Sequence, residues 1–113
     1  MNLQTILNLI EGNQVTNIES NVEIEYALTS DLMSDVLTLE VENSVLITGL
    51  NNMQTIRTAE MSDISCIIIA RNRKVSNEMI ALANQNNIAI IESPYGVFRV
   101  SGILYTNGIK PIY

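Results

Sequence analysis

The chain has 113 residues, of which 47% are hydrophobic and 16% charged, and its formal net charge is −6. This length predicts one domain, residues 1–113, and the lone Cys66 in a chain without histidine excludes an internal disulfide and a Cys/His zinc site. Six basic residues with four Tyr and one Phe supply neither a basic stripe nor a stacking platform, so we expect no nucleic-acid binding.

The N-terminal part of the chain predicts a helix followed by two strands. Apolar residues at helical spacing within residues 3–10 predict an amphipathic helix, with Gly12 as the residue that ends it. Gln14 to Ile18 is a short strand candidate. Alternating apolar and polar residues from Val22 to Leu28 predict a half-exposed strand near the edge of a sheet.

A second helix is expected to begin at Ser30. Ser30 has the side chain of a good N-cap, and Asp31 would lie in the first turn, where the helix dipole favours a negative charge. Leu32, Met33, Val36 and Leu37 then recur at helical spacing. This expected helix comes before the first of the buried strands described next.

Three later apolar runs predict the centre of a parallel sheet. They are Val45 to Thr48, Cys66 to Ala70 and Ile88 to Ile91. They do not alternate, which is typical of strands covered on both faces, and a helical pattern follows each of them. We therefore expect an α/β layered domain with a mostly parallel sheet of about four or five strands flanked by helices. The expected helix caps are Asn51 and Asn52, then Ser76, then Ser93 with Pro94 at the first helical position.

Two segments carry a resemblance to a known family. SDLMSDVLTLEVENSVLITGLNNMQTIRTAEMSD at residues 30–63 and SPYGVF at residues 93–98 are similar to the short stand-alone members of the DRTGG domain family. The resemblance implies a compact α/β domain like the N-terminal domain of HPr kinase, a domain usually fused to CBS domains in regulated pyrophosphatases or to acyltransferase domains. Stand-alone copies tend to accompany iron hydrogenases and signalling proteins. The family has no established activity of its own.

The chain departs from the motif that names this family. The motif has an Asp-Arg pair after the first glycine and Thr-Gly-Gly after the next strand, where this chain has Leu50-Asn51 and Ala70-Arg71-Asn72. An asparagine costs more than a glycine at positive φ, and its Cβ holds a ligand further from the backbone. A family binding role that depends on paired glycines is therefore not carried over to this chain.

A ligand site is expected at the carboxyl ends of the parallel strands, where loops and helix N-termini converge. We expect a small anion there, such as a nucleotide phosphate, with Arg71 as a partly buried guanidinium and Arg73 and Lys74 further into solvent. The alternative is that the same residues act only as helix caps and as a solvated turn. The candidate ligand-binding residues are Thr48, Gly49, Asn51, Asn52, Arg71, Ser93 and Tyr95.

No catalytic residue, metal site or cofactor is expected. Asp31 and Asp35 lie four residues apart, near enough to share a metal, but the helix dipole explains the first and solvent exposure the second. Cys66 begins a buried strand, where burial should raise its pKa, and one thiolate cannot hold an iron–sulfur cluster. The apolar runs are shorter than the roughly 18–20 residues that span a bilayer, and no signal peptide is evident, so we expect a cytoplasmic protein that does not bind membranes.

The leading interpretation is a non-catalytic regulatory or protein-interaction module that senses a small anionic ligand and serves a redox (iron hydrogenase-type) or signalling partner. A purely structural scaffold subunit and an enzyme that uses carboxylates and arginines are the alternatives. We also expect a homodimer, because so apolar a surface favours a self-complementary contact. Its expected contact residues, on the last helix and the tail, are Phe98, Tyr105, Ile109 and Ile112.

Overall fold

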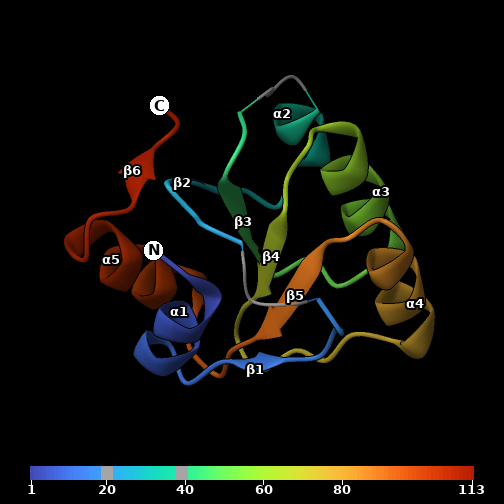
Figure 1. The fold of residues 1–113 in the computed structure, drawn as a ribbon, viewed down its shortest axis with the longest axis horizontal. Coiled ribbons are helices and arrows are strands. Elements are labelled where there is room, and N and C mark those ends of the chain that lie inside the picture. The colour runs from blue at the N-terminus through green and yellow to red at the C-terminus, as the bar shows by residue number, and fades with distance from the viewer. Residues whose placement is uncertain (19–21, 38–40) are drawn as a thin grey trace.

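A six-stranded sheet organises the protein, in a computed structural model that describes residues 1–18, 22–37 and 41–113 (Figure 1). The strand order is β1-β5-β4-β3-β2-β6, and β1 pairs antiparallel while the other pairs are parallel. The strands are β1 (Asn13–Gln14), β2 (Tyr26–Thr29), β3 (Ser44–Thr48), β4 (Cys66–Ile69), β5 (Ala89–Glu92) and β6 (Lys110–Pro111). The helices are α1 (Leu3–Leu9), α2 (Met33–Val36), α3 (Met53–Met61), α4 (Asn77–Gln85) and α5 (Val97–Thr106).

This architecture confirms the expected α/β fold with a mostly parallel sheet. The sheet has two strands more than the central four because β1 and β6 add two residues each at its edges. The N–H of Lys110 in β6 donates to the Glu25 carbonyl just before β2, and the N–H of Ile112 just after β6 donates to the Ala27 carbonyl in β2. Within the described ranges the longest helix is α5, with 10 residues, so no helix there has the length to cross a bilayer.

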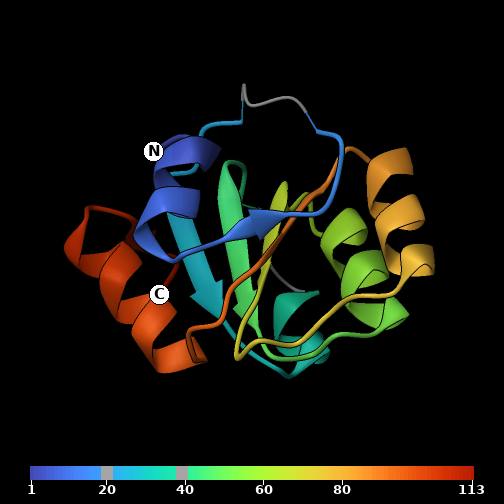
Figure 2. The same cartoon turned by 90° about the horizontal axis from the view of Figure 1, so that it is seen from below.

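Helices cover both faces of the sheet, α1 and α5 on one side and α2, α3 and α4 on the other (Figure 2). Strand β4 shows why the sequence does not alternate. Cys66 and Ile68 pack with α1 and α5, whereas Ile67 and Ile69 pack with the three other helices. All four side chains are buried, so both faces of the strand require apolar residues.

The expected start of the second helix is wrong. Helix α2 begins at Met33, with Leu32 at the N-cap and no capping side chain. The hydroxyl of Ser30 instead accepts a hydrogen bond from the Leu32 N–H at 3.0 Å, which forms a local turn before the helix. Asp31 points back to the end of β3 and is not in the first turn of α2. The strand expected at 22–28 is also shorter, since β2 begins at Tyr26.

The expected start of the last helix is wrong as well, whereas two other caps are confirmed. Helix α5 begins at Val97 after Gly96, because the Ser93 hydroxyl donates to the Ile10 carbonyl at 2.7 Å and ties the end of β5 to α1. Asn52 caps α3 and Ser76 caps α4, as expected. Asn51 caps nothing. Its side-chain amide donates to the Lys74 carbonyl at 2.8 Å.

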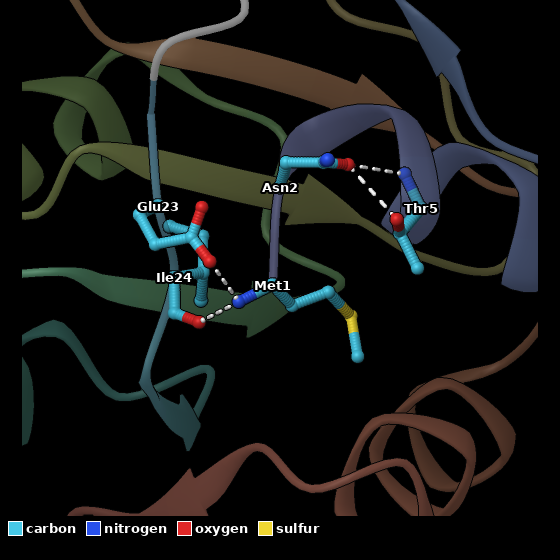
Figure 3. A network of polar contacts seen from close by, with 5 residues as sticks. All are labelled: Met1, Asn2, Thr5, Glu23 and Ile24. Carbon is cyan, nitrogen blue, oxygen red and sulfur yellow. Dashed lines mark hydrogen bonds and ion pairs between the residues drawn. The ribbon is translucent and has the colours of Figure 1, made fainter.

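The N-terminal residues are tied to the segment before β2, as Figure 3 shows. The ammonium group of Met1 donates to Glu23 Oε1 at 2.7 Å and to the Ile24 carbonyl at 2.9 Å. Asn2 caps α1 by accepting from the Thr5 N–H and hydroxyl. These bonds hold α1 in place over its face of the sheet, where Leu3 and Ile6 are buried.

Gly12 packs closely against β5 and does not terminate α1 through a left-handed conformation. The left-handed residue there is Glu11, with φ 51°, whereas a Cβ added at Gly12 would lie 2.6 Å from Ile91 Cγ2. We expect Gly12→Ala to lower the free energy of unfolding by about 1–3 kcal/mol, because the β-branched Ile91 in a packed strand has little freedom to move away. Urea unfolding followed by circular dichroism measures this loss.

Gly102 provides the matched control for this prediction. It lies on α5, and an added Cβ would meet nothing within 4 Å. Gly102→Ala should therefore stabilise the single folded chain by about 0.5–1 kcal/mol through helix propensity. Equal and small effects of the two substitutions would show that Gly12 is not a packing constraint.

Candidate functional site

The end of β3 binds a carboxylate from a different part of the chain. The buried Thr48 hydroxyl donates to Asp31 Oδ1 at 2.7 Å, and the Gly49 N–H donates to the same oxygen at 2.8 Å. The Thr48 bond is the largest influence that holds the pKa of Asp31 below its ordinary value, followed by the Gly49 bond. Burial opposes this change in pKa, and the charges of Arg73 and Arg71 add to it.

A polar cavity of about 300 Å³ opens beside this carboxylate. It lies at the carboxyl ends of the central strands, which is where a ligand site was expected. It combines an acid, two guanidinium groups and two aliphatic side chains. The lining residues are Asp31, Gly49, Leu50, Arg71, Arg73 and Val97.

The arginines lie on a turn that main-chain hydrogen bonds hold in place. Arg71 and Asn72 have φ values of 65° and 60°, in the left-handed region. The Arg71 N–H donates to the Tyr95 carbonyl at 2.7 Å, and the Asn72 N–H donates to the Ser93 carbonyl at 2.9 Å. The connection from β5 to α5 therefore fixes the direction in which this turn leaves β4.

Glu92 fixes the other end of the same loop. Its carboxylate is buried and accepts from the Val75 N–H at 2.9 Å, and the Lys74 ammonium lies 3.5 Å from its other oxygen. Lys74 thus pairs with an internal acid. Arg71 is exposed, not partly buried as expected, and Arg73 lines the same cavity, so the expected contrast between these two arginines is wrong.

The structure brings only some of the predicted site residues together. Gly49 and Arg71 line the cavity, and Thr48 lies behind the Asp31 carboxylate. The other four already have partners: Asn51 on the Lys74 carbonyl, Asn52 as the cap of α3, Ser93 on the Ile10 carbonyl, and Tyr95 with the Arg99 guanidinium 3.6 Å from its ring centroid. Asp31, Leu50, Arg73 and Val97 were not among the candidates. Arg73 had been expected at this edge of the sheet, but further into solvent than Arg71 and not as a ligand-binding residue.

A second, apolar cavity of about 420 Å³ lies between α5 and the strands β2 and β6. None of its lining residues carries a charged side chain. The rings of Phe98 and Tyr105 stand at its edge with 91% and 66% of their surface exposed, whereas Ile109 is buried. The lining residues are Ala27, Leu28, Thr29, Ile47, Phe98, Ser101, Gly102, Tyr105, Thr106, Ile109, Pro111, Ile112 and Tyr113, and we call them the α5 groove.

Chemistry at the remaining reactive groups is limited by their positions. Cys66 is fully buried, and this burial raises the pKa of its thiol to about 12. Within the described part of the chain, no three acidic or cysteine side chains are grouped closely enough to hold a metal ion. The polar cavity and the α5 groove remain as candidate binding sites.

Comparisons with known proteins agree with the fold. The crystal structure of the CBS and DRTGG domains of the regulatory region of Clostridium perfringens pyrophosphatase, complexed with its activator diadenosine tetraphosphate, is similar with a TM-score of 0.73. The sequences are 18% identical, and the match covers 90% of this chain and 45% of that one. No curated protein matches the chain. The sequence model of the DRTGG domain matches residues 5–107, and the chain therefore belongs to the DRTGG domain family.

Proposed function

We propose that this protein is a non-catalytic regulatory module that binds a small anion, such as a nucleotide phosphate, in the polar cavity. The observation that carries this proposal is the pair of arginines, Arg71 and Arg73, which line one cavity. Neither guanidinium forms a hydrogen bond or an ion pair with the part of the chain that the structure describes. A guanidinium can donate two parallel hydrogen bonds to a phosphate, so two of them form a strong anion site.

The structural neighbour supports a regulatory role. In that protein the DRTGG domain belongs to a regulatory region whose complex contains a nucleotide activator. We extend regulation to this chain because it belongs to the same family and has the same fold. The partner that it regulates would be a redox protein of the iron hydrogenase type or a signalling protein, because stand-alone members that resemble this chain tend to accompany such proteins.

We expect nucleotides to raise the melting temperature of the wild-type protein, and Arg71→Ala and Arg73→Ala each to weaken that binding. Each lost charge-assisted hydrogen bond is worth about 1.5–3 kcal/mol, which corresponds to about a 10- to 100-fold increase in dissociation constant. The double variant should show no ligand-induced shift. Thermal unfolding across a panel of nucleoside mono-, di- and triphosphates measures this effect.

Two matched controls accompany this experiment. Arg57, exposed on α3, does not line the cavity, so Arg57→Ala removes the same charge without touching the site. Lys74→Ala should also leave the ligand-induced shift in place, because the Lys74 ammonium lies beside Glu92. A full ligand-induced shift in the double arginine variant would refute the proposed site.

We further propose that a second copy of the chain covers the α5 groove. Two chains that each carry a charge of −6 repel each other, and this repulsion is weakest where an uncharged face of one meets an uncharged face of the other. The groove and its exposed rings lie on one face. A two-fold axis would therefore place Phe98 of each copy against the groove of the other, in a self-complementary contact.

A further inference from the structure

We propose that the Asp31 carboxylate is a built-in competitor that a ligand must displace from the end of β3, an inference that rests on the proposed function. Thr48 and Gly49 aim a hydroxyl and a main-chain N–H at one point, and Asp31 Oδ1 lies at that point, 2.7 and 2.8 Å from the two donors. Two converging donors beside two guanidinium groups are what a phosphate oxygen requires. Asp31 thus holds the position that an anionic ligand would take.

The charges in the cavity make the Asp31 carboxylate and an anionic ligand compete for one position. Arg71 and Arg73 supply two positive charges, and Asp31 supplies one negative charge in the lining of the same cavity. An incoming anion is attracted by the arginines and repelled by the carboxylate, and this repulsion lasts as long as Asp31 stays in place. Removal of the carboxylate would free two donors and relieve the repulsion at once.

The Asp31 carboxylate is free to rotate away from the Thr48 and Gly49 donors at the end of β3. Asp31 is exposed, so a rotation about its own side-chain bonds carries the carboxylate into water. The flanking chain has its own attachments, because the Ser30 N–H donates to the Ile47 carbonyl and Met33 is buried against the sheet. The release of Asp31 therefore does not require the unfolding of β2 or α2.

This competition selects for ligands of high charge. A monoanion gains little by replacing one carboxylate with another, whereas a di- or triphosphate keeps further charges for Arg71 and Arg73 after it has displaced Asp31. We infer that the cavity distinguishes nucleoside di- and triphosphates from monoanions, and that Asp31 sets this threshold.

The test is calorimetric titration of ATP and of inorganic phosphate into the wild-type protein and into Asp31→Asn. Asparagine keeps the size of the side chain and an oxygen that accepts from Thr48 and Gly49, so the variant is expected to fold. The dissociation constant for ATP should fall by about tenfold or more, because a like charge is gone. Binding of inorganic phosphate should become measurable.

Glu60→Gln is the matched control, since it removes one negative charge from an exposed position on α3 that does not line the cavity. It should change the dissociation constant for ATP by less than about twofold, because distant surface charges are screened. A second measurement is the Gly49 amide signal in nitrogen-15 NMR spectra. ATP should shift this signal in the wild-type protein as phosphate replaces Asp31 Oδ1.

The outcomes separate this inference from the proposed function. If the wild-type protein binds ATP through the two arginines but Asp31→Asn binds ATP no more tightly, the inference that Asp31 competes with the ligand is overturned. The proposed anion site is then still supported. If only Asp31→Asn binds ATP, and this binding is lost when Arg71 and Arg73 are also substituted, then Asp31 is a competitor strong enough to prevent binding to the wild-type protein. No binding of either probe to either protein would overturn both proposals.

Discussion

Cys66 is expected to react with a thiol reagent at least about a thousandfold more slowly in the folded protein than in the chain unfolded in urea. Burial raises the pKa of this thiol to about 12 from an ordinary value of 9.0, so the reactive thiolate fraction near pH 8 falls by about that factor. The apolar side chains packed around Cys66 also block access of the reagent and slow the reaction further. Stopped-flow absorbance with an aromatic disulfide reagent, with and without urea, measures the ratio.

The same thiol gives the protein a pH dependence with a defined sign. Because the folded state binds the thiol proton more tightly than the unfolded state, the contribution is fully present below pH 9 and is lost as the pH rises toward about 12. Cys66→Ser should remove this alkaline slope from urea unfolding curves. Rapid labelling of the native protein would show that β4 is accessible and that the thiol is not a core side chain.

Phe98→Asp is expected to convert a dimer into a monomer of 12.5 kDa. In the single chain this ring is 91% exposed, so the substitution should leave the folded monomer intact. In a dimer across the α5 groove, the new carboxylate would be buried without a partner, a change that costs several kcal/mol and raises the dissociation constant by about a hundredfold or more. Sedimentation velocity at low micromolar concentration distinguishes the two states.

Met61→Asp is the matched control for this substitution. Met61 is 73% exposed on α3, on the face of the sheet opposite to α5 (Figure 2). It should leave the oligomeric state unchanged, so a loss of the dimer in both variants would implicate charge alone. If the wild-type protein is a monomer at this concentration, the proposal that a second copy covers the α5 groove is refuted.

The central fold could be predicted from the sequence because its signals are local. Strands covered on both faces need apolar side chains at every position, and β3, β4 and β5 follow the three apolar runs closely. The edge strands β1 and β6 have two residues each, which is too few for a periodic pattern. Their pairing depends on neighbours that are brought close only by the fold.

The errors at the helix starts have a common cause. Ser30 and Ser93 both looked like N-caps. However, Asp31 beside Ser30, and the Ser93 hydroxyl itself, each form a hydrogen bond that the local sequence does not reveal. Ser93 donates to a carbonyl 83 residues away, and Asp31 accepts from Thr48, 17 residues away. Capping preference is a local quantity, so long-range hydrogen bonds override it.

The candidate cavity lies at the carboxyl ends of the strands, where a ligand site was expected, but its lining matches only part of the predicted residue set. Gly49 and Arg71 could be found because they directly follow buried strands. Asp31 could not, since it follows β2 and its signal was the same as that of a dipole-stabilising acid. Val97 lies on α5 and packs against the core as well as lining the cavity, so its apolar side chain gave no sign of a site.

The outer edge of β6 determines how two copies can meet. Lys110 and Ile112 turn their N–H groups toward β2, so the residue that faces outward between them is Pro111, which has no N–H to offer. A further strand added at this edge would lack a ladder bond at that position. Two copies therefore cannot readily join their sheets through β6, and the same proline protects this apolar corner against fibril-like stacking.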